Sequence, residues 1–143
     1  MMLYRTATTA DAPALVELLK VLGYEVSRES VTQRLMSIRS QGGEVIVAED
    51  AGQVVGCVQA LVDTRLAEGQ AGEIVSLVVF DSYRGHGVGT ALLHTARSWL
   101  AERNCKALRI RANAIRTEAH RLYRAQGFQE VKTQKIFKQE IGD

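Results

Sequence analysis

The stretch from Arg84 to Thr90 carries the clearest chemical signal in this chain. An apolar run ends at Asp81, glycines occupy positions 85, 87 and 89, and a helical pattern follows at once. A glycine-rich turn between a strand and a helix points backbone N–H groups at a phosphate, because the first helical turn leaves those donors without partners. The N–H donors expected at this turn belong to Gly85, His86, Gly87, Val88, Gly89 and Thr90. The sequence therefore predicts a phosphate-bearing ligand.

Two common phosphate motifs do not fit this turn. It lacks the terminal Gly-Lys-Ser/Thr of the nucleoside-triphosphate loop. Its glycine spacing also misses the G-x-G-x-x-G of a dinucleotide-binding fold. The remaining pattern is Arg84-x-x-Gly87-x-Gly89, in which Arg84 or His86 adds positive charge at the rim. A nucleotide-binding domain is therefore disfavoured, and the plain alternative is a tight turn that uses glycine only for its geometry.

This pattern resembles the acetyl-coenzyme A loop of the GNAT superfamily of N-acetyltransferases, Arg/Gln-x-x-Gly-x-Gly/Ala. Two more segments are similar to that family. The segment 119–128 resembles its late helix and the turn that leaves it. Glu73 lies eleven residues before Arg84, where many members carry a catalytic carboxylate. The resemblance implies acetyl-coenzyme A (acetyl-CoA) as the co-substrate and direct transfer of its acetyl group to an amine in a ternary complex.

The resemblance also implies roles for individual residues. Glu73 is the expected general base and Tyr123 the expected general acid near the coenzyme sulfur. The backbone of Val78 and Val79 is expected to pair with the pantetheine arm like an added strand. Asn113 is the expected side-chain contact to that arm, although it lies ten residues before Tyr123, a longer spacing than the family's usual one, and Arg116 is the alternative.

Direct transfer explains why a base and an acid are needed. A lysine-like amine has a pKa of about 10.4, so its deprotonation at pH 7 costs roughly 4.6 kcal/mol. A carboxylate near the thioester lowers this cost by accepting the proton, directly or through water. The leaving thiolate, with a pKa of about 8.5 by analogy with cysteine, gains from a proton donor. A non-catalytic acyl-CoA sensor needs the loop but neither Glu73 nor Tyr123, so the sequence favours the enzyme.

The length predicts a single domain over 1–143, and the order of the expected strands and helices predicts a mixed sheet. The resemblance implies the α/β (α+β) fold class, with a GNAT-like, mostly antiparallel sheet of six to seven strands and about four helices. The expected strands cover 3–8, 44–49, 54–63, 73–80, 107–112 and 128–139, and the expected helices cover about 10–22, 28–41, 87–103 and 117–126. The segment 65–72 is expected to be a polar loop.

Composition excludes several other classes. A net charge of +2 with scattered basic residues does not indicate nucleic-acid binding. No apolar stretch approaches the ~18 residues of a membrane span, and the first residues lack a signal core, which predicts a cytoplasmic protein. Cys57 and Cys105 are far apart, so we expect no metal site and no cysteine nucleophile. Exposed strand edges predict a homodimer.

The identity of the acceptor amine does not follow from the sequence. Its site is expected to be lined by 23–29, by 65–72 and by the final strand, because these segments vary in this fold. The four glutamates at 25, 29, 68 and 73 are compatible with a cationic amine, but scattered surface acids are the commoner explanation. Small-molecule amines, amino acids, aminoglycosides and protein amines therefore all remain open.

Overall fold

The computed structural model of the chain describes residues 1–111 and 117–142. Residues Met1–Arg111 form one compact unit, and Ala112–Asp143 form a second. Within the described residues, no helix is long and apolar enough to cross a membrane.

The first unit is built on one mixed sheet whose strands lie in the order β1-β2-β3-β4-β5. These strands are β1 (Met2–Thr6), β2 (Glu44–Asp50), β3 (Gln53–Arg65), β4 (Gly69–Val79) and β5 (Leu108–Ile110). The first three pairings are antiparallel and the β4–β5 pairing is parallel. The expected mixed, mostly antiparallel sheet is therefore confirmed, but the described residues form five strands and not six to seven.

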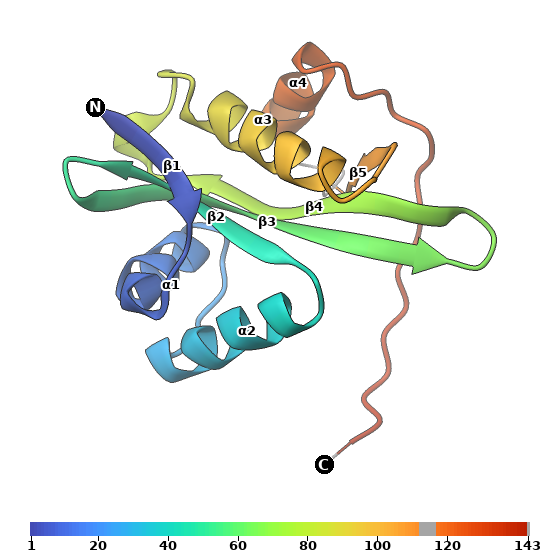
Figure 1. Cartoon of the computed structure of the whole chain (residues 1–143), viewed down its shortest axis with the longest axis horizontal. Coiled ribbons are helices and arrows are strands. Elements are labelled where there is room, and N and C mark those ends of the chain that lie inside the picture. The colour runs from blue at the N-terminus through green and yellow to red at the C-terminus, as the bar shows by residue number, and fades with distance from the viewer. Residues whose placement is uncertain (112–116, 143) are drawn as a thin grey trace. The chain divides into compact units, whose positions relative to one another are not determined.

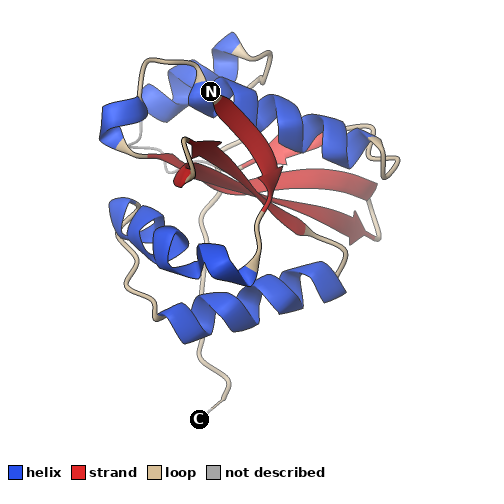
Figure 2. Ribbon diagram, turned by 60° about the vertical axis from the view of Figure 1, so that its left-hand side comes forward, coloured by secondary structure: helices blue, strands red, loops and turns tan. Residues whose placement is uncertain are grey.

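Helices cover both faces of this sheet (Figure 1). The helices α1 (Ala12–Val21) and α2 (Arg28–Ser40) lie against one face, and α3 (Val88–Ala101) lies against the other. Turned by 60°, the sheet again separates α3 from the pair of α1 and α2 (Figure 2). Ser27 begins α2 as an N-cap whose side chain accepts a hydrogen bond from the Ser30 N–H at 3.1 Å.

A buried apolar core lies between the sheet and the α1–α2 pair. Alternate strand residues such as Val45, Val47 and Cys57 pack there against Leu15 and Leu35. On the opposite face, α3 approaches the sheet closely over Gly72, where an added Cβ would lie 2.7 Å from Leu100 Cδ1. From Gly56 onward, residues of β3 with odd numbers therefore face α1 and α2, and those with even numbers face α3.

The expected polar loop over 65–72 is wrong. The strands β3 and β4 continue through most of it, leaving only residues 66–68 as a turn. Main-chain pairing extends to Thr64 with Gln70 and Arg65 with Gly69. The sequence shows no alternating apolar pattern here, because one face of the hairpin carries charged side chains that form ion pairs. The sequence predicts Glu73 at the start of a strand, but because β4 begins at Gly69, Glu73 lies in the interior of the strand.

The second unit contains α4 (Thr117–Ala125), which ends before Gly127 in the left-handed conformation with φ +90°. The ring of Tyr123 packs edge to face on Phe128 with centroids 6.2 Å apart. The expected strand over 128–139 is wrong, since residues 128–142 form neither helix nor strand. Its apolar residues do not alternate as a half-buried strand requires, because Ile136 and Phe137 are adjacent, and both are exposed.

Candidate functional site

The glycine turn predicted to hold a phosphate leads from β4 into α3. A short 3-10 turn, Asp81–Tyr83, follows β4, and Gly85 and Gly87 then take φ values of +81° and +80°. Glycine is favoured at such angles because a Cβ would clash with the backbone. Space above both residues is open, since an added Cβ would meet no atom within 4 Å.

Among the described residues, no side chain caps the backbone donors in the first turn of α3. Gly87 is the N-cap and has no side chain to accept from them. The first intrahelical bond runs from the Ala91 N–H to the Gly87 carbonyl at 3.0 Å. The N–H groups of Val88, Gly89 and Thr90 precede that bond and lie at the positive end of the helix. This geometry fits an anionic ligand.

Arg84, expected to add positive charge at the rim of the turn, also makes two contacts within it. Its Nε donates to the Val79 carbonyl at 3.3 Å, and Nη1 lies 2.8 Å from Asp81 Oδ1. Half of its side chain is exposed, and the neighbouring His86 is exposed as well. Both residues therefore carry accessible polar groups beside the α3 N-terminus.

A bulge in β4 interrupts its pairing with β3. Cys57 faces Val78 and Gln59 faces Val75, so β4 uses one residue more than β3 over this step. Ser76 takes a φ of +55° there. On the other side, β5 pairs with β4 only over Gly72–Ile74. In the part of the chain that the structure describes, the segment 75–79, which includes Val78 and Val79, has no strand on that side.

Glu73 lies in the interior of β4 and is 9% exposed. Its Oε1 lies 3.2 Å from Arg109 Nε and 3.3 Å from Arg111 Nε. Arg109 is also the register partner of Glu73 on β5. The sequence interpretation missed both arginines, although their i, i+2 spacing on an expected strand places them on one face. The parallel pairing that brings them to Glu73 could not be read from the sequence.

Arg109 joins Glu73 to a larger charged cluster. Its Nη1 lies 3.1 Å from Glu68 Oε2 and its Nη2 lies 3.3 Å from Asp63 Oδ2, which also pairs with Arg65 at 2.7 Å. We call these residues and Arg111 the carboxylate–arginine cluster. It has three acids and three arginines, so its net charge is zero. Because Glu73 pairs across the strands with Leu61, the cluster lies on the sheet face that α1 and α2 share.

The contact between Glu73 and Arg109 is ionic and poorly directed. Glu73 Oε1 and Arg109 Nε are buried atoms that lack a hydrogen bond of good geometry in the described part of the chain. Their separation is nevertheless that of an ion pair, and charge attraction does not require alignment. Glu73 Oε1 can therefore accept a further hydrogen bond.

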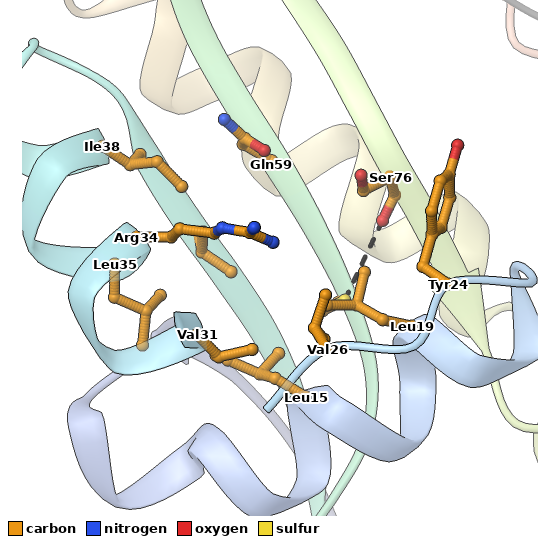
Figure 3. A pocket seen from close by; sticks show the side chains of 12 residues that line it. Leu15, Leu19, Tyr24, Val26, Val31, Arg34, Leu35, Ile38, Gln59 and Ser76 are labelled. Atoms are coloured by element: carbon orange, nitrogen blue, oxygen red, sulfur yellow. Dashed lines mark hydrogen bonds between the residues drawn. The ribbon is translucent and has the colours of Figure 1, made fainter. Parts of the chain in front are cut away.

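A pocket of about 250 Å³ opens on the same sheet face, between the sheet and the α1–α2 pair (Figure 3). The segment between these helices contributes Tyr24 and Val26 to its lining. Ser76 closes it at the β4 bulge, where its carbonyl accepts a weak hydrogen bond from Cys57 Sγ at 3.8 Å. The full lining is Leu15, Leu19, Tyr24, Val26, Val31, Arg34, Leu35, Ile38, Val45, Cys57, Gln59 and Ser76.

Other predicted site residues are placed as follows. Tyr123 lies on α4 in the second unit and is partly buried. Asn113 and Arg116 lie outside the described residues. Burial raises the pKa of the Cys57 thiol to about 12, which fits an inert core residue. The described residues hold no group of His, Cys, Asp and Glu arranged to bind a metal.

Comparisons with known proteins identify the family to which this chain belongs. The model of the Acetyltransferase (GNAT) family matches residues 12–128. An aminoglycoside N(6')-acetyltransferase type 1 from Stenotrophomonas maltophilia is 28% identical over 90% of this chain and 86% of its own length. An N-alpha-acetyltransferase from Sulfurisphaera tokodaii is 31% identical over 60% of this chain and 56% of its own.

A solved structure shares the fold at low identity. AAC(6')-Iy in complex with the bisubstrate analogue CoA-S-monomethyl-acetylneamine superposes with a TM-score of 0.85 over 99% of both chains, at 16% identity. At this identity the likeness concerns the fold alone, and it agrees with the sheet and helix arrangement described above.

Proposed function

Because this chain belongs to the GNAT acetyltransferase family and is an N-acetyltransferase, we propose that it binds acetyl-CoA at the α3 turn and transfers the acetyl group to an amine held over β4. The observation that carries the proposal is the positive-φ turn at Gly85 and Gly87 with uncapped N–H groups behind it. Open space over both glycines is what a pyrophosphate needs for close approach. Acetyl-CoA supplies the activated thioester, and the protein has to position and deprotonate the amine.

Different groups of the protein are proposed to bind the phosphates and the extended arm of the coenzyme. Arg84 and His86 add donors beside the N–H groups of residues 85–90 for the phosphates. The unpaired side of 75–79, with Val78 and Val79 at its end, accepts an extended ligand as a strand would. In this arrangement an N–H of that segment is available to polarise the thioester carbonyl. A ligand paired there lies beside the bulge at Ser76.

Glu73 is the proposed general base. It projects on the same face as the pocket, three residues before Ser76, and two arginines form ion pairs with its carboxylate. An amine proton reaches this carboxylate directly or through one water. Tyr123 is the proposed acid for the leaving thiolate, and the role of Asn113 against the pantetheine arm, with Arg116 as alternative, stays a prediction. These assignments rest on the match between this chain and the family motifs.

The wider setting is also proposed. We infer one functional domain over 1–143, a cytoplasmic location, a homodimer and no metal requirement. The names of the two relatives make aminoglycoside amines and protein α-amines the first acceptor classes to test.

Two measurements test the proposed function separately from the acceptor. Calorimetry with coenzyme A tests the α3 turn, and a thiol-release assay with acetyl-CoA across several amine classes tests transfer. Tyr123→Phe is expected to reduce kcat at unchanged coenzyme affinity. Tight coenzyme binding without transfer to any amine would instead favour the non-catalytic acyl-CoA sensor.

A further inference from the structure

The pocket under α1 and α2 has a lining that restricts the acceptor. Most of its lining is aliphatic and comes from α1, α2 and the segment between them. None of its lining residues is Asp or Glu, and Arg34 is its one formal charge. Glu25 lies in the segment between α1 and α2, and Glu29 lies in α2. Both are exposed, and neither lines the pocket. A polycationic acceptor would therefore meet a like charge with no carboxylate in the lining to offset it.

Arg34 is placed to bind an anion. It extends from α2 toward the middle of the pocket, with Gln59 of β3 and Ser76 of β4 beyond it (Figure 3). Eight other arginines of the described chain have a carboxylate within 4.0 Å: Arg5, Arg39, Arg65, Arg84, Arg103, Arg109, Arg111 and Arg124. Among the described residues, no such partner is recorded for Arg34. Its planar guanidinium group matches a carboxylate of a ligand.

The volume of the pocket also favours a small acceptor over a large polycationic one. Pockets for drug-sized ligands hold about 300–1,000 Å³, and this one holds about 250 Å³. The pocket interior has room for one small apolar group and one anionic group, and a ligand with several sugar rings would extend outside it. Ser76 belongs both to the pocket and to the segment proposed to hold the pantetheine arm. Ser76 therefore joins the proposed acceptor pocket to the proposed coenzyme site, and Glu73 lies on the same sheet face, three positions earlier in β4.

We propose, given the proposed function above, that the acceptor is an α-amino acid with an apolar side chain. Arg34 binds its carboxylate, the aliphatic lining holds its side chain, and its amine points to the β4 bulge. In the reaction, a bond forms between the amine nitrogen and the acetyl carbon, and the bond from that carbon to the coenzyme sulfur breaks. The amine proton goes to Glu73 and the sulfur leaves as the thiolate or thiol.

The test compares acceptors that differ in one group. Leucine, leucinamide and kanamycin are each measured with acetyl-CoA by thiol release, and by calorimetry in the presence of coenzyme A. Leucine and leucinamide share an apolar body and an α-amine, but leucinamide lacks the negative charge. We expect leucine to exceed leucinamide about 10- to 100-fold in kcat/KM, and kanamycin to be the poorest acceptor.

A pair of variants assigns this preference to one side chain. Arg34→Gln is expected to raise the KM for leucine about 10- to 100-fold at similar kcat and to leave leucinamide unchanged. Arg34→Lys should recover part of the leucine affinity. Arg28→Gln is the matched control, because Arg28 lies on the same helix, is exposed and does not line the pocket.

The outcomes separate this inference from the proposed function. Preference for kanamycin or leucinamide, equal leucine affinity in Arg34→Gln, or coenzyme binding without binding of leucine would overturn the inference alone. Preference for leucinamide would indicate peptide N-termini as acceptors. Failure to bind coenzyme A would overturn the proposed function itself.

Discussion

Glu73 and Arg109 face each other across the parallel pairing of β4 and β5, with Oε1 and Nε 3.2 Å apart. The same oxygen also lies 3.3 Å from Arg111 Nε. The contact with Arg109 lacks hydrogen-bond geometry, so this buried oxygen can still accept a further hydrogen bond. An available acceptor direction is the property expected of a carboxylate that takes a proton from an amine, directly or through water.

Replacing the carboxylate should therefore abolish most turnover. Glu73→Gln is expected to lower kcat about 10²- to 10⁴-fold without changing the affinity for coenzyme A, because the amide cannot accept the proton. The measurement is steady-state thiol release combined with calorimetry. Glu68→Gln is the matched control, since Glu68 contacts the same Arg109 but is half-exposed on the hairpin turn. Equal losses in both variants would assign Glu73 a structural role in the cluster.

The glycine turn can be tested with a strain-matched pair of variants. Gly87→Ala places a Cβ at φ +80°, which costs roughly 1–2 kcal/mol, and also fills space proposed for the pyrophosphate. We expect the Kd for coenzyme A to rise about tenfold or more. Gly52→Ala introduces the same kind of strain at φ +82° in the β2–β3 turn, also into open space. It should lose similar stability and keep its coenzyme affinity, and a loss of affinity in both variants would contradict the phosphate-binding role.

The stability at acidic pH should depend on Asp11. Arg5 donates to both carboxylate oxygens of Asp11 at 2.8 and 2.9 Å, and this contact, chiefly, lowers the pKa of Asp11 below its usual value. A lowered folded-state pKa gives stability above the unfolded value of about 3.9, and this stability is lost as the pH falls through the folded value. Asp11→Asn should reduce the free energy of unfolding by about 1–3 kcal/mol at pH 7.

Urea titrations at several pH values measure this effect. The difference between wild type and Asp11→Asn should shrink as the pH falls below about 4. Glu17→Gln is the control, because its exposed pair with Lys20 at 3.4 Å is expected to contribute less than about 1 kcal/mol. A constant difference between wild type and Asp11→Asn down to pH 2 would contradict the ionic origin of the effect.

The two thiols should react differently in the folded protein. Thiolates are the reactive form, and burial raises the pKa of Cys57 to about 12, so this thiol stays protonated at neutral pH. Cys105 is partly exposed. Ellman's reagent should therefore detect Cys105 in the native state and Cys57 only after denaturation. In Cys105→Ser the native signal should disappear, and a native signal from Cys57 would show that the core over β3 opens readily.

The turn at Gly87 could be predicted from the sequence because its signal is local. A glycine pattern between an apolar strand and a helix specifies positive φ and free N–H groups without any knowledge of the rest of the fold. Glu73 is also a candidate from the sequence, through its distance from Arg84 and the family resemblance. Its two arginine partners were not, because parallel pairing joins residues that lie 36 and 38 positions apart and leaves no local pattern.

The errors have the same origin. The sequence predicts a loop over 65–72 because the segment is polar, whereas in the structure Arg109 of β5 pairs with Glu68 of the turn and with Asp63 of β3. The sequence also predicts a strand over 128–139, but β-branched and aromatic residues form a strand only where neighbouring strands and a core pack against them. Arg34 could not be recognised either, since a lone arginine on an amphipathic helix has no distinguishing pattern until a pocket forms around it.

The extra residue at Ser76 has a consequence for the evolution of this chain. Glu73 and Val78 are five positions apart, an odd number, yet they point to the same side of the sheet because the bulge changes the alternation between them. Loss of this one extra residue would restore regular pairing and leave Val78 opposite Cys57, facing the core that it shares with α1 and α2. The strand can therefore lose the bulge without turning its side chains over, and the change would fall on the Ser76 end of the pocket.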